Sequence, residues 1–306
     1  MKQKKWIYIG FIILQGIIYG VHDPLAKLVY REIPVYFFLA ARYILGCLIF
    51  LILFRKRLME DWKKASISSL LLPSLCLSLA YVCVNQALGK TDATLVVFLR
   101  SLGALFTVML SFGINRKLPR GKDYALGLLL LAGLWFLFCS GGTYVINAGV
   151  FLALAGALLV AGALVFGEEA VKSASPLVLS FLQTVASAVI CMVCAVCKHE
   201  IHRDTFVRMA KPEYILILIY AAAAVGCLGF LLQNMALAHI PSRLVGVLQC
   251  SYPLTTMIVA PFLLGEVLAG FRLFGAMLVL VCIVLNALDQ GESCDTIQVS
   301  NTQEIG

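Results

Sequence analysis

Long runs of apolar residues, separated by short polar stretches, follow one another along almost the whole chain. Each run has 18 to 25 residues, which lets an α-helix cross the roughly 30 Å hydrocarbon core of a bilayer. The alternating segments of about ten residues that build a membrane β-barrel are not seen. The pattern therefore predicts ten transmembrane helices, at about residues 6–30, 35–54, 68–88, 93–114, 124–145, 148–171, 177–197, 214–237, 244–264 and 270–288.

The composition agrees with this interpretation. Hydrophobic residues make up 61% of the 306 residues and charged residues 13%, whereas soluble domains have about 45–50% apolar and about 25% charged residues. A soluble protein is excluded, and no length is left for a separate soluble domain. Most of the 11 cysteines lie inside apolar runs and are expected to pack as small side chains. We expect an all-α membrane protein whose function lies within the bilayer.

Basic residues predict the orientation of the helices, because cytoplasmic loops collect Lys and Arg. If the N-terminus is inside, the first three inner segments hold twelve basic residues, against Arg31 and Lys90 outside. The later loop at 198–211 opposes this bias, but the first half usually dominates insertion. We expect a plasma-membrane protein with both termini in the cytoplasm, an uncleaved first helix, and a disordered acidic tail at 289–306. The net charge of +8 is attributed to topology, so nucleic acid is not an expected partner.

An internal repeat divides the chain in two. Asn85-Gln-Ala-Leu88 matches Asn234-Met-Ala-Leu237 at an offset of 149 residues, and each match is followed by a polar break and a new apolar run. We place the first unit at residues 1–145 and the second at 146–288. Because each unit has five helices, an odd number, the two must enter the membrane from opposite sides. This inverted-repeat plan is typical of secondary transporters.

Four elements of the second unit resemble the EamA-type repeat of the drug/metabolite transporter superfamily. They are Asn-Met-Ala-Leu at 234–237, Pro-Ser-Arg at 241–243, Tyr-Pro at 252–253 and Leu-Gly-Glu at 264–266. The first unit departs from the pattern, with Ala104 in place of the proline and Arg116 or Lys117 in place of the glutamate. The resemblance implies a ten-helix carrier whose cavity is lined by helices one, three, four, six, eight and nine. Members of this superfamily carry amino acids, nucleotide sugars, phosphorylated metabolites or amphiphilic drugs.

Arg100 is the most informative ionisable residue, because charges inside hydrocarbon cost about 2.5–3.5 kcal/mol on insertion scales. It lies seven residues past Ala93, about 10 Å along its helix. The resemblance adds that phosphate-carrying branches place a lysine at the equivalent position, four residues before the helix-four proline. A guanidinium there can hold a carboxylate or phosphate bidentately. The alternative is a structural ion pair.

Other polar residues within the spans divide into two groups. The first is assigned to gating or structure, because its members lie on the peripheral second helix or near helix ends: Arg42, His22, Asp23, Lys27, Glu168 and Glu169. For Arg42 we expect Glu168, Glu169 or a carbonyl as partner, and for the others a solvated helix end is the alternative. The second group is assigned to substrate binding together with Arg100: Gln249, which is its repeat mate, Tyr252, Asn85, Asn234 and Tyr81. For the two asparagines, helix capping explains the sequence equally well.

No motif indicates a cofactor, a metal or catalysis. Cys191, Cys194 and Cys197 lie on an apolar helix, and His199 and His202 are too closely spaced for a His-Glu-x-x-His zinc motif. The sequence favours a secondary transporter over a membrane enzyme or sensor. We expect a small polar substrate, anionic or zwitterionic, with the lipid bilayer and a coupling ion or exchanged metabolite as further partners. The alternative is a polyspecific drug or amino-acid exporter.

Overall fold

The computed structural model describes residues 2–115, 147–249, 251–266, 270–271 and 273–282, and single residues or pairs at 128–129, 132–133, 135–136, 139–140, 143–144 and 285. Within these residues, eight helical stretches are long and apolar enough to cross a membrane: Lys5–Val29, Val35–Trp62, Ile67–Leu88, Ala93–Ser111, Ala148–Ser173, Pro176–Cys197, Pro212–Leu237 and Ser242–Leu264. A shorter apolar helix, Leu273–Cys282, lies in the predicted tenth span. The chain is therefore a multi-pass helical membrane protein.

The first half begins with three long helices, and its fourth span is made of two shorter ones. They are α1 (Lys2–Val29), α2 (Val35–Trp62), α3 (Ile67–Leu88), α4 (Ala93–Ser101) and α5 (Gly103–Asn115). The end of α2 lies eight residues beyond the predicted one, because the charged segment after Phe54 contains no Pro or Gly to stop a helix. Most of the predicted fifth span and the whole of the predicted tail at 289–306 lie outside the described residues.

A two-residue strand pair occupies the end of the predicted fifth span. β1 (Cys139–Ser140) and β2 (Thr143–Tyr144) pair antiparallel. The prediction of a helix that continues to residue 145 is therefore wrong at its end. The sequence of this stretch contains two glycines, at 141 and 142, and glycine is unfavourable in the interior of a helix.

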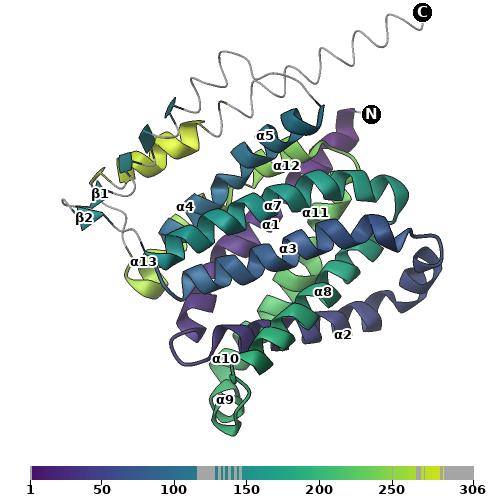
Figure 1. Cartoon of the computed structure of the whole chain (residues 1–306), viewed down its shortest axis with the longest axis horizontal. Helices are drawn as coiled ribbons and strands as arrows, with labels where there is room; N and C mark the ends of the chain where they lie inside the picture. The colour runs from purple at the N-terminus through teal and green to yellow at the C-terminus, as the bar shows by residue number, and fades with distance from the viewer. Residues whose placement is uncertain are drawn as a thin grey trace, which may run out of the picture.

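The second half repeats this arrangement with more interruptions. Its elements are α7 (Ala148–Ser173), α8 (Pro176–Cys197), α9 (Arg203–Met209), α10 (Pro212–Tyr220), the π-helix η1 (Ala221–Gly229), α11 (Phe230–Leu237), α12 (Ser242–Leu248) and α13 (Ser251–Leu264). The short α9 lies in a connection that the apolar pattern did not resolve, and it projects from one end of the bundle beside α10 (Figure 1). α10, η1 and α11 form one continuous span.

The π-helix provides backbone acceptors inside the bundle. Its wider turns place three carbonyls within reach of side chains from neighbouring helices. Val225 accepts from the Tyr19 hydroxyl at 3.1 Å, Gly226 from Thr184 at 3.3 Å and Gly229 from Gln15 at 2.9 Å. These bonds attach α1 and α8 to the middle of this span.

Small residues allow α3 and α7 to pack closely along their length (Figure 1). Ala153, Ala157 and Ala161 recur every four positions on α7 and are fully buried. At Gly156, a β-carbon would lie 2.7 Å from the Val84 side chain, so only glycine fits there. This is the close helix contact that small residues at this spacing favour.

Both broken spans are interrupted at matching places in the two halves. α4 ends at Ser101 and α5 begins at Gly103, while α12 ends at Leu248 and α13 begins at Ser251. Arg100 lies just before the first break. Gln249, which is 149 residues later, lies within the second. Leu102 keeps helical dihedrals (φ −60°, ψ −17°), so the first interruption is a single tightened turn within one apolar span, Ala93–Ser111.

Candidate functional site

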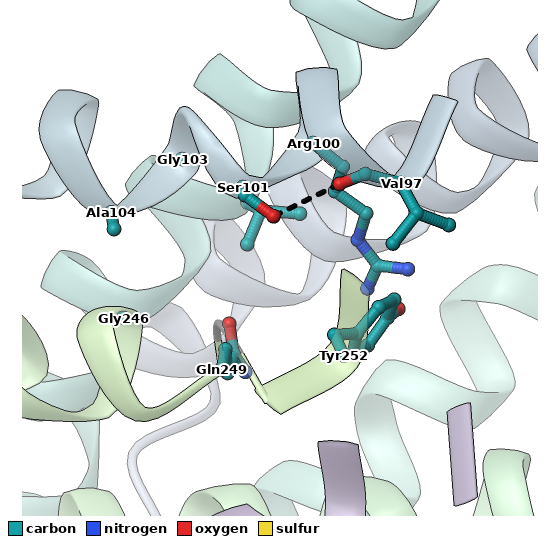
Figure 2. A pocket seen from close by; sticks show the side chains of 9 residues that line it. Val97, Arg100, Ser101, Gly103, Ala104, Gly246, Gln249 and Tyr252 are labelled. Carbon is teal, nitrogen blue, oxygen red and sulfur yellow. Dashed lines mark hydrogen bonds between the residues drawn. The ribbon is translucent and has the colours of Figure 1, made fainter. Parts of the chain in front are cut away.

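Arg100 is buried at the centre of the bundle and is surrounded by tyrosines from three other helices. Its guanidinium carbon lies 4.4 Å from the ring centre of Tyr252, 5.0 Å from that of Tyr81 and 5.8 Å from that of Tyr19. One terminal nitrogen also donates to the Tyr81 hydroxyl at 3.1 Å. Ring faces attract a cation, more strongly when it is desolvated. Figure 2 shows the guanidinium extending toward the Tyr252 ring.

Arg100 is one end of a chain of polar contacts that runs through α1 to α2. Its Nη1 lies 3.9 Å from Asp23 Oδ2, which has no hydrogen-bond donor among the described residues. Asp23 Oδ1 lies 3.3 Å from His22 Nδ1, and His22 Nε2 lies 3.2 Å from Arg42 Nη1. Arg42 also donates to the Tyr43 hydroxyl at 3.1 Å. We call Arg42, His22, Asp23 and Arg100 the charged cluster.

The geometry determines the protonation of His22. Arginine has only donors, so His22 Nε2 must accept from Arg42. The proton of the neutral ring then lies on Nδ1 and is donated to Asp23. With a neutral histidine, two arginines face one carboxylate, and the charged cluster has an excess of one positive charge.

A small cavity adjoins Arg100 at the crossing of α4, α5, α7, α12 and α13. Its volume is about 20 Å³, and its lining includes Ser101, Ala104, Gln249 and Tyr252 (Figure 2). A cavity needs about 10–15 Å³ to hold one water, whereas ligand pockets have about 300–1,000 Å³. In this structure the cavity therefore has room for a water molecule and not for a larger ligand.

Three glutamines form a neutral polar group beside the cavity. Gln249 Nε2 donates to Gln233 Oε1 at 2.9 Å and to Gln15 Oε1 at 3.2 Å, and Gln15 Nε2 donates to Gln233 at 3.1 Å. Gln233 Nε2 and the Tyr252 hydroxyl are buried and have no hydrogen-bond partner among the described residues. We call Gln15, Gln233 and Gln249 the glutamine group.

The sequence interpretation missed Gln15 and Tyr19. Both lie on the face of α1 that also carries Asp23, since residues four apart lie above one another on a helix. That spacing, and a single glutamine inside the run from Trp6 to Tyr30, were the signals available.

Lys27 and Glu266 form an ion pair near one end of the bundle. Lys27 Nζ lies 2.5 Å from Glu266 Oε1 and donates to the Thr91 carbonyl at 2.7 Å. Glu266 Oε2 accepts from the Thr94 amide at 3.4 Å. These contacts join the ends of α1 and α13 to the start of α4, where a carboxylate is favoured by the exposed helix amides.

Glu168 makes the corresponding contact in the other half. Its Oε2 accepts from the Ser242 amide at 2.8 Å, at the start of α12. Glu169 instead pairs with Lys172 on the surface of α7 at 2.6 Å, as a solvated helix end would.

Arg42 has different partners from those predicted. The carboxylate of Glu168 accepts from the Ser242 amide, and that of Glu169 pairs with Lys172. The prediction that one of these glutamates pairs with Arg42 is therefore wrong. The partners of Arg42 are His22 and Tyr43. The alternative of a solvated helix end for His22 and Asp23 is also wrong, because 1% and 5% of their surfaces are exposed. The distance of His22 and Asp23 from the start of α1 suggested a position at the membrane–water interface. In the structure, α2 and α4 cover this part of α1.

Asn85 and Asn234 are buried in contacts away from the cavity. Asn85 accepts from the Tyr30 hydroxyl at 2.6 Å and donates to the Tyr81 carbonyl at 2.7 Å. Asn234 donates to Ser180 at 2.9 Å and to Gln183 at 2.7 Å. Neither side chain lines the cavity at Arg100. Of the residues assigned to substrate binding, the structure thus brings together Arg100, Tyr81, Tyr252 and Gln249.

Outside the spans, the connection before α10 carries an exposed ion pair. Lys211 Nζ lies 2.5 Å from Glu32 Oε2, and the bonds from Lys211 and Tyr214 lower the pKa of the Glu32 carboxyl. In the part of the chain that the structure describes, no group of three or more His, Cys, Asp or Glu side chains is placed to hold a metal ion.

Comparison with known proteins adds a family to this geometry. Residues 6–139 and 147–288 match the EamA-like transporter family. YwfM, an uncharacterized transporter of Bacillus subtilis, is 25% identical over 181 residues, and the match covers 58% of this chain and 59% of YwfM. An uncharacterized transporter of Archaeoglobus fulgidus is 23% identical over 278 residues, covering 90% of this chain and 84% of that protein. A solved crystal structure superposes with a TM-score of 0.67 at 16% identity over 91% of this chain and 94% of that one, which shows a shared fold.

Proposed function

The chain belongs to the EamA-like transporter family, and we propose that it carries a small anionic or zwitterionic metabolite by alternating access at Arg100. Members of this family are membrane transporters and not enzymes. The observation that carries the proposal is the excess positive charge of the charged cluster, buried beside the broken helix α4–α5. A carboxylate or phosphate at Arg100 would neutralise that charge and accept a bidentate hydrogen bond.

Unpaired polar atoms near Arg100 support the same location. Asp23 Oδ2, the Tyr252 hydroxyl and Gln233 Nε2 are buried without a hydrogen-bond partner among the described residues. Buried polar groups are normally paired, so unpaired ones need an explanation. A polar substrate would provide partners for them.

Two end contacts support ten helices in two inverted repeats. The start of α4 contacts Glu266, which follows the end of α13. The start of α12 contacts Glu168, near the end of α7. α12 and α13 belong to one span of 23 residues, about 34 Å long. The equivalent helices α4 and α12 therefore begin at opposite ends of the bundle.

Those same contacts give alternating access a physical basis. Lys27 with Glu266 closes one end of the bundle, and Glu168 on the Ser242 amide joins helices at the other. We propose that these contacts open in turn, with a coupling ion or an exchanged metabolite driving the cycle. The basic residues of the first half favour cytoplasmic termini, and we propose the plasma membrane as the location. Cysteines placed at Lys4 and Ser300 should react with an impermeant reagent only after cells are opened, and labelling of intact cells would contradict this orientation.

A thermal-stability screen of the purified protein tests the substrate class. Carboxylates, phosphates, amino acids and cationic drugs should be compared at equal concentration, because a ligand that binds only the folded protein raises its unfolding temperature. Anions or zwitterions should stabilise the wild type and should not stabilise Arg100→Ala. Stabilisation by cationic drugs alone would overturn the proposal.

One observation favours a second candidate function, the export of cationic drugs. Tyr19, Tyr81 and Tyr252 form an aromatic wall, and Asp23 supplies a carboxylate beside it. These groups suit an aromatic cation, but the positive charges of Arg42 and Arg100 would repel it. In the same screen, this alternative predicts stabilisation by drugs that Asp23→Asn removes.

A further inference from the structure

A larger groove, which shares no lining residue with the cavity at Arg100, lies between the end of α2, the start of α8 and the end of α11. Its volume is about 380 Å³, within the range of about 300–1,000 Å³ that is usual for ligand sites. Four apolar side chains line it, from Phe54, Leu177, Leu231 and Met235. Arg57 and His239 line it as well. Figure 1 shows α8 lying beside α2 along this side of the bundle.

The groove spans the boundary between the apolar and the charged part of α2. Ile52 and Leu53 are 79% and 65% exposed, as expected for side chains that face lipid. Directly after Phe54, the exposed residues Arg55, Lys56 and Arg57 begin the charged end of the helix. A molecule in the groove therefore meets apolar side chains toward the bilayer core and a cation toward its surface.

The polar part of the groove is suited to an anion. In the part of the chain that the structure describes, no carboxylate forms an ion pair with Arg57. Ser175 and Pro176, at the positive N-terminal end of the 22-residue helix α8, also line the groove. Glu60 and Asp61 follow on α2, but neither lines it. His239 has its Nδ1 2.9 Å from the Met235 carbonyl, and its ring stacks on Tyr8.

We propose that this groove binds one anionic glycerophospholipid, with its phosphate at Arg57 and an acyl chain along Phe54, Leu231 and Met235. A basic residue at the end of a groove between membrane helices is how anionic headgroups are commonly bound. The apolar lining selects an amphiphile over a free anion. The charge selects an anionic headgroup over a zwitterionic one, and the site does not depend on which substrate the protein carries.

Native mass spectrometry of the full chain tests the proposal. The protein, released from neutral detergent, is given equal amounts of phosphatidylglycerol and phosphatidylcholine, and the retained lipids are counted. Wild type should retain one phosphatidylglycerol in preference to phosphatidylcholine. Arg57→Ala should lower this retention at least fivefold, and Arg57→Lys should preserve most of it.

Lys56→Ala is the matched control, since Lys56 is an adjacent exposed cation that does not line the groove. It should retain phosphatidylglycerol like the wild type. Met235→Trp should lower retention by filling the apolar part while leaving Arg57 in place. Unfolding temperatures without lipid should show that all variants are folded.

Four results would overturn the proposal. Equal losses in Lys56→Ala and Arg57→Ala would indicate diffuse attraction to a basic surface. Equal retention of phosphatidylcholine would indicate ordinary lipid solvation, and displacement by inorganic phosphate would indicate a site for free anions. Retention that appears only after residues 289–306 are deleted would identify the acidic tail as the occupant.

Discussion

The two halves of the bundle meet the central cavity with different chemistry at equivalent places. Beside the α4–α5 break, the first half presents a guanidinium, Arg100, linked to Asp23, His22 and Arg42. Beside the α12–α13 break, the second half presents a neutral amide, Gln249, bonded to Gln15 and Gln233. Both halves match the same family, but the charges that they place beside the cavity differ.

The difference in charge between the two halves suggests that opening of the bundle and recognition of the substrate depend on different features. We propose that matching interruptions and helix contacts in the two halves allow either end of the bundle to open. Recognition of one substrate needs a single charged position, because a second buried guanidinium at Gln249 would add a further unpaired charge in hydrocarbon. We therefore expect the first half to bind the charged group of the substrate and the second half to contribute neutral hydrogen bonds.

The largest effect is expected at Arg100. Arg100→Ala should weaken binding of the best anion from the stability screen by about 2–5 kcal/mol, about thirtyfold or more, because a buried charge loses its partner. Arg100→Lys should retain weak binding, since it keeps the charge and loses the planar fork. Isothermal titration measures both, with the exposed Arg31→Ala as control. Unchanged affinity in a folded Arg100→Ala protein would remove the basis of the comparison.

Arg42, at the other end of the charged cluster, should act on stability. Arg42→Ala leaves His22 Nε2 buried without a donor, which costs about 1–3 kcal/mol. The unfolding temperature should fall, and the preference for anions should weaken less than in Arg100→Ala, because the excess positive charge is lost while the Arg100 guanidinium stays in place. Tyr43→Phe removes only a hydroxyl that accepts from Arg42 and should have a smaller effect. A loss of anion binding as large as that of Arg100→Ala would instead place Arg42 in the binding site.

The substitution Gln249→Ala tests the contribution of the second half, which presents a neutral amide to the cavity. Gln249→Ala should weaken binding by about 0.5–1.5 kcal/mol, or about two- to twelvefold, which is typical of one neutral hydrogen bond. Titration with the same anion gives the value. A loss as large as that of Arg100→Ala would mean that both halves contribute equally, contrary to the asymmetry argued above.

The end contact at Lys27 should affect access to the cavity. Lys27→Met removes the ion pair with Glu266, and for a pair of this kind we expect about 0.5–1 kcal/mol, or about two- to fivefold faster labelling of a cysteine at Ser101. Lys90→Met, an exposed lysine at the same end of the bundle, should leave the rate unchanged. Equal rates in all three proteins would show that Lys27 does not hold this end closed.

The smallest effect is expected for the exposed pair of Glu32 and Lys211. The pKa of Glu32 is lower in the folded protein than in the unfolded chain, because Lys211 and Tyr214 bond its carboxylate. Its contribution to stability is therefore present above the unfolded pKa and lost as the pH falls through the folded pKa. Unfolding temperatures measured down to about pH 3 should fall slightly less for Glu32→Gln than for wild type. Glu213→Gln should behave like wild type, and high salt should remove the difference.

The fold was predictable from the sequence because a bilayer imposes long apolar helices. Arg100 could be singled out as a candidate for the same reason, since one charge inside an apolar run is costly enough to need a purpose. The breaks in the fourth and ninth spans were not predictable, because no proline marks position 102 and the apolar run continues through it.

The partners of the site residues could not be derived from spacing along one helix. Asp23 meets Arg100, and His22 meets Arg42, only because α2 and α4 pack against the same part of α1. Asn85 and Asn234 show the opposite case. Their positions in the repeat match, but tertiary contacts bind both away from the cavity.

The most direct test of the account is to vary the charge of the ligand. The affinity of the best carboxylate from the screen should be compared with that of its neutral amide in wild type, Arg100→Gln and Gln249→Ala. We predict that wild type and Gln249→Ala prefer the carboxylate by tenfold or more, about 1.4 kcal/mol, and that Arg100→Gln binds both ligands alike. If Arg100→Gln kept the full preference for the carboxylate over the amide, or if Gln249→Ala lost it, the claim that the first half binds the charged group of the substrate would be contradicted.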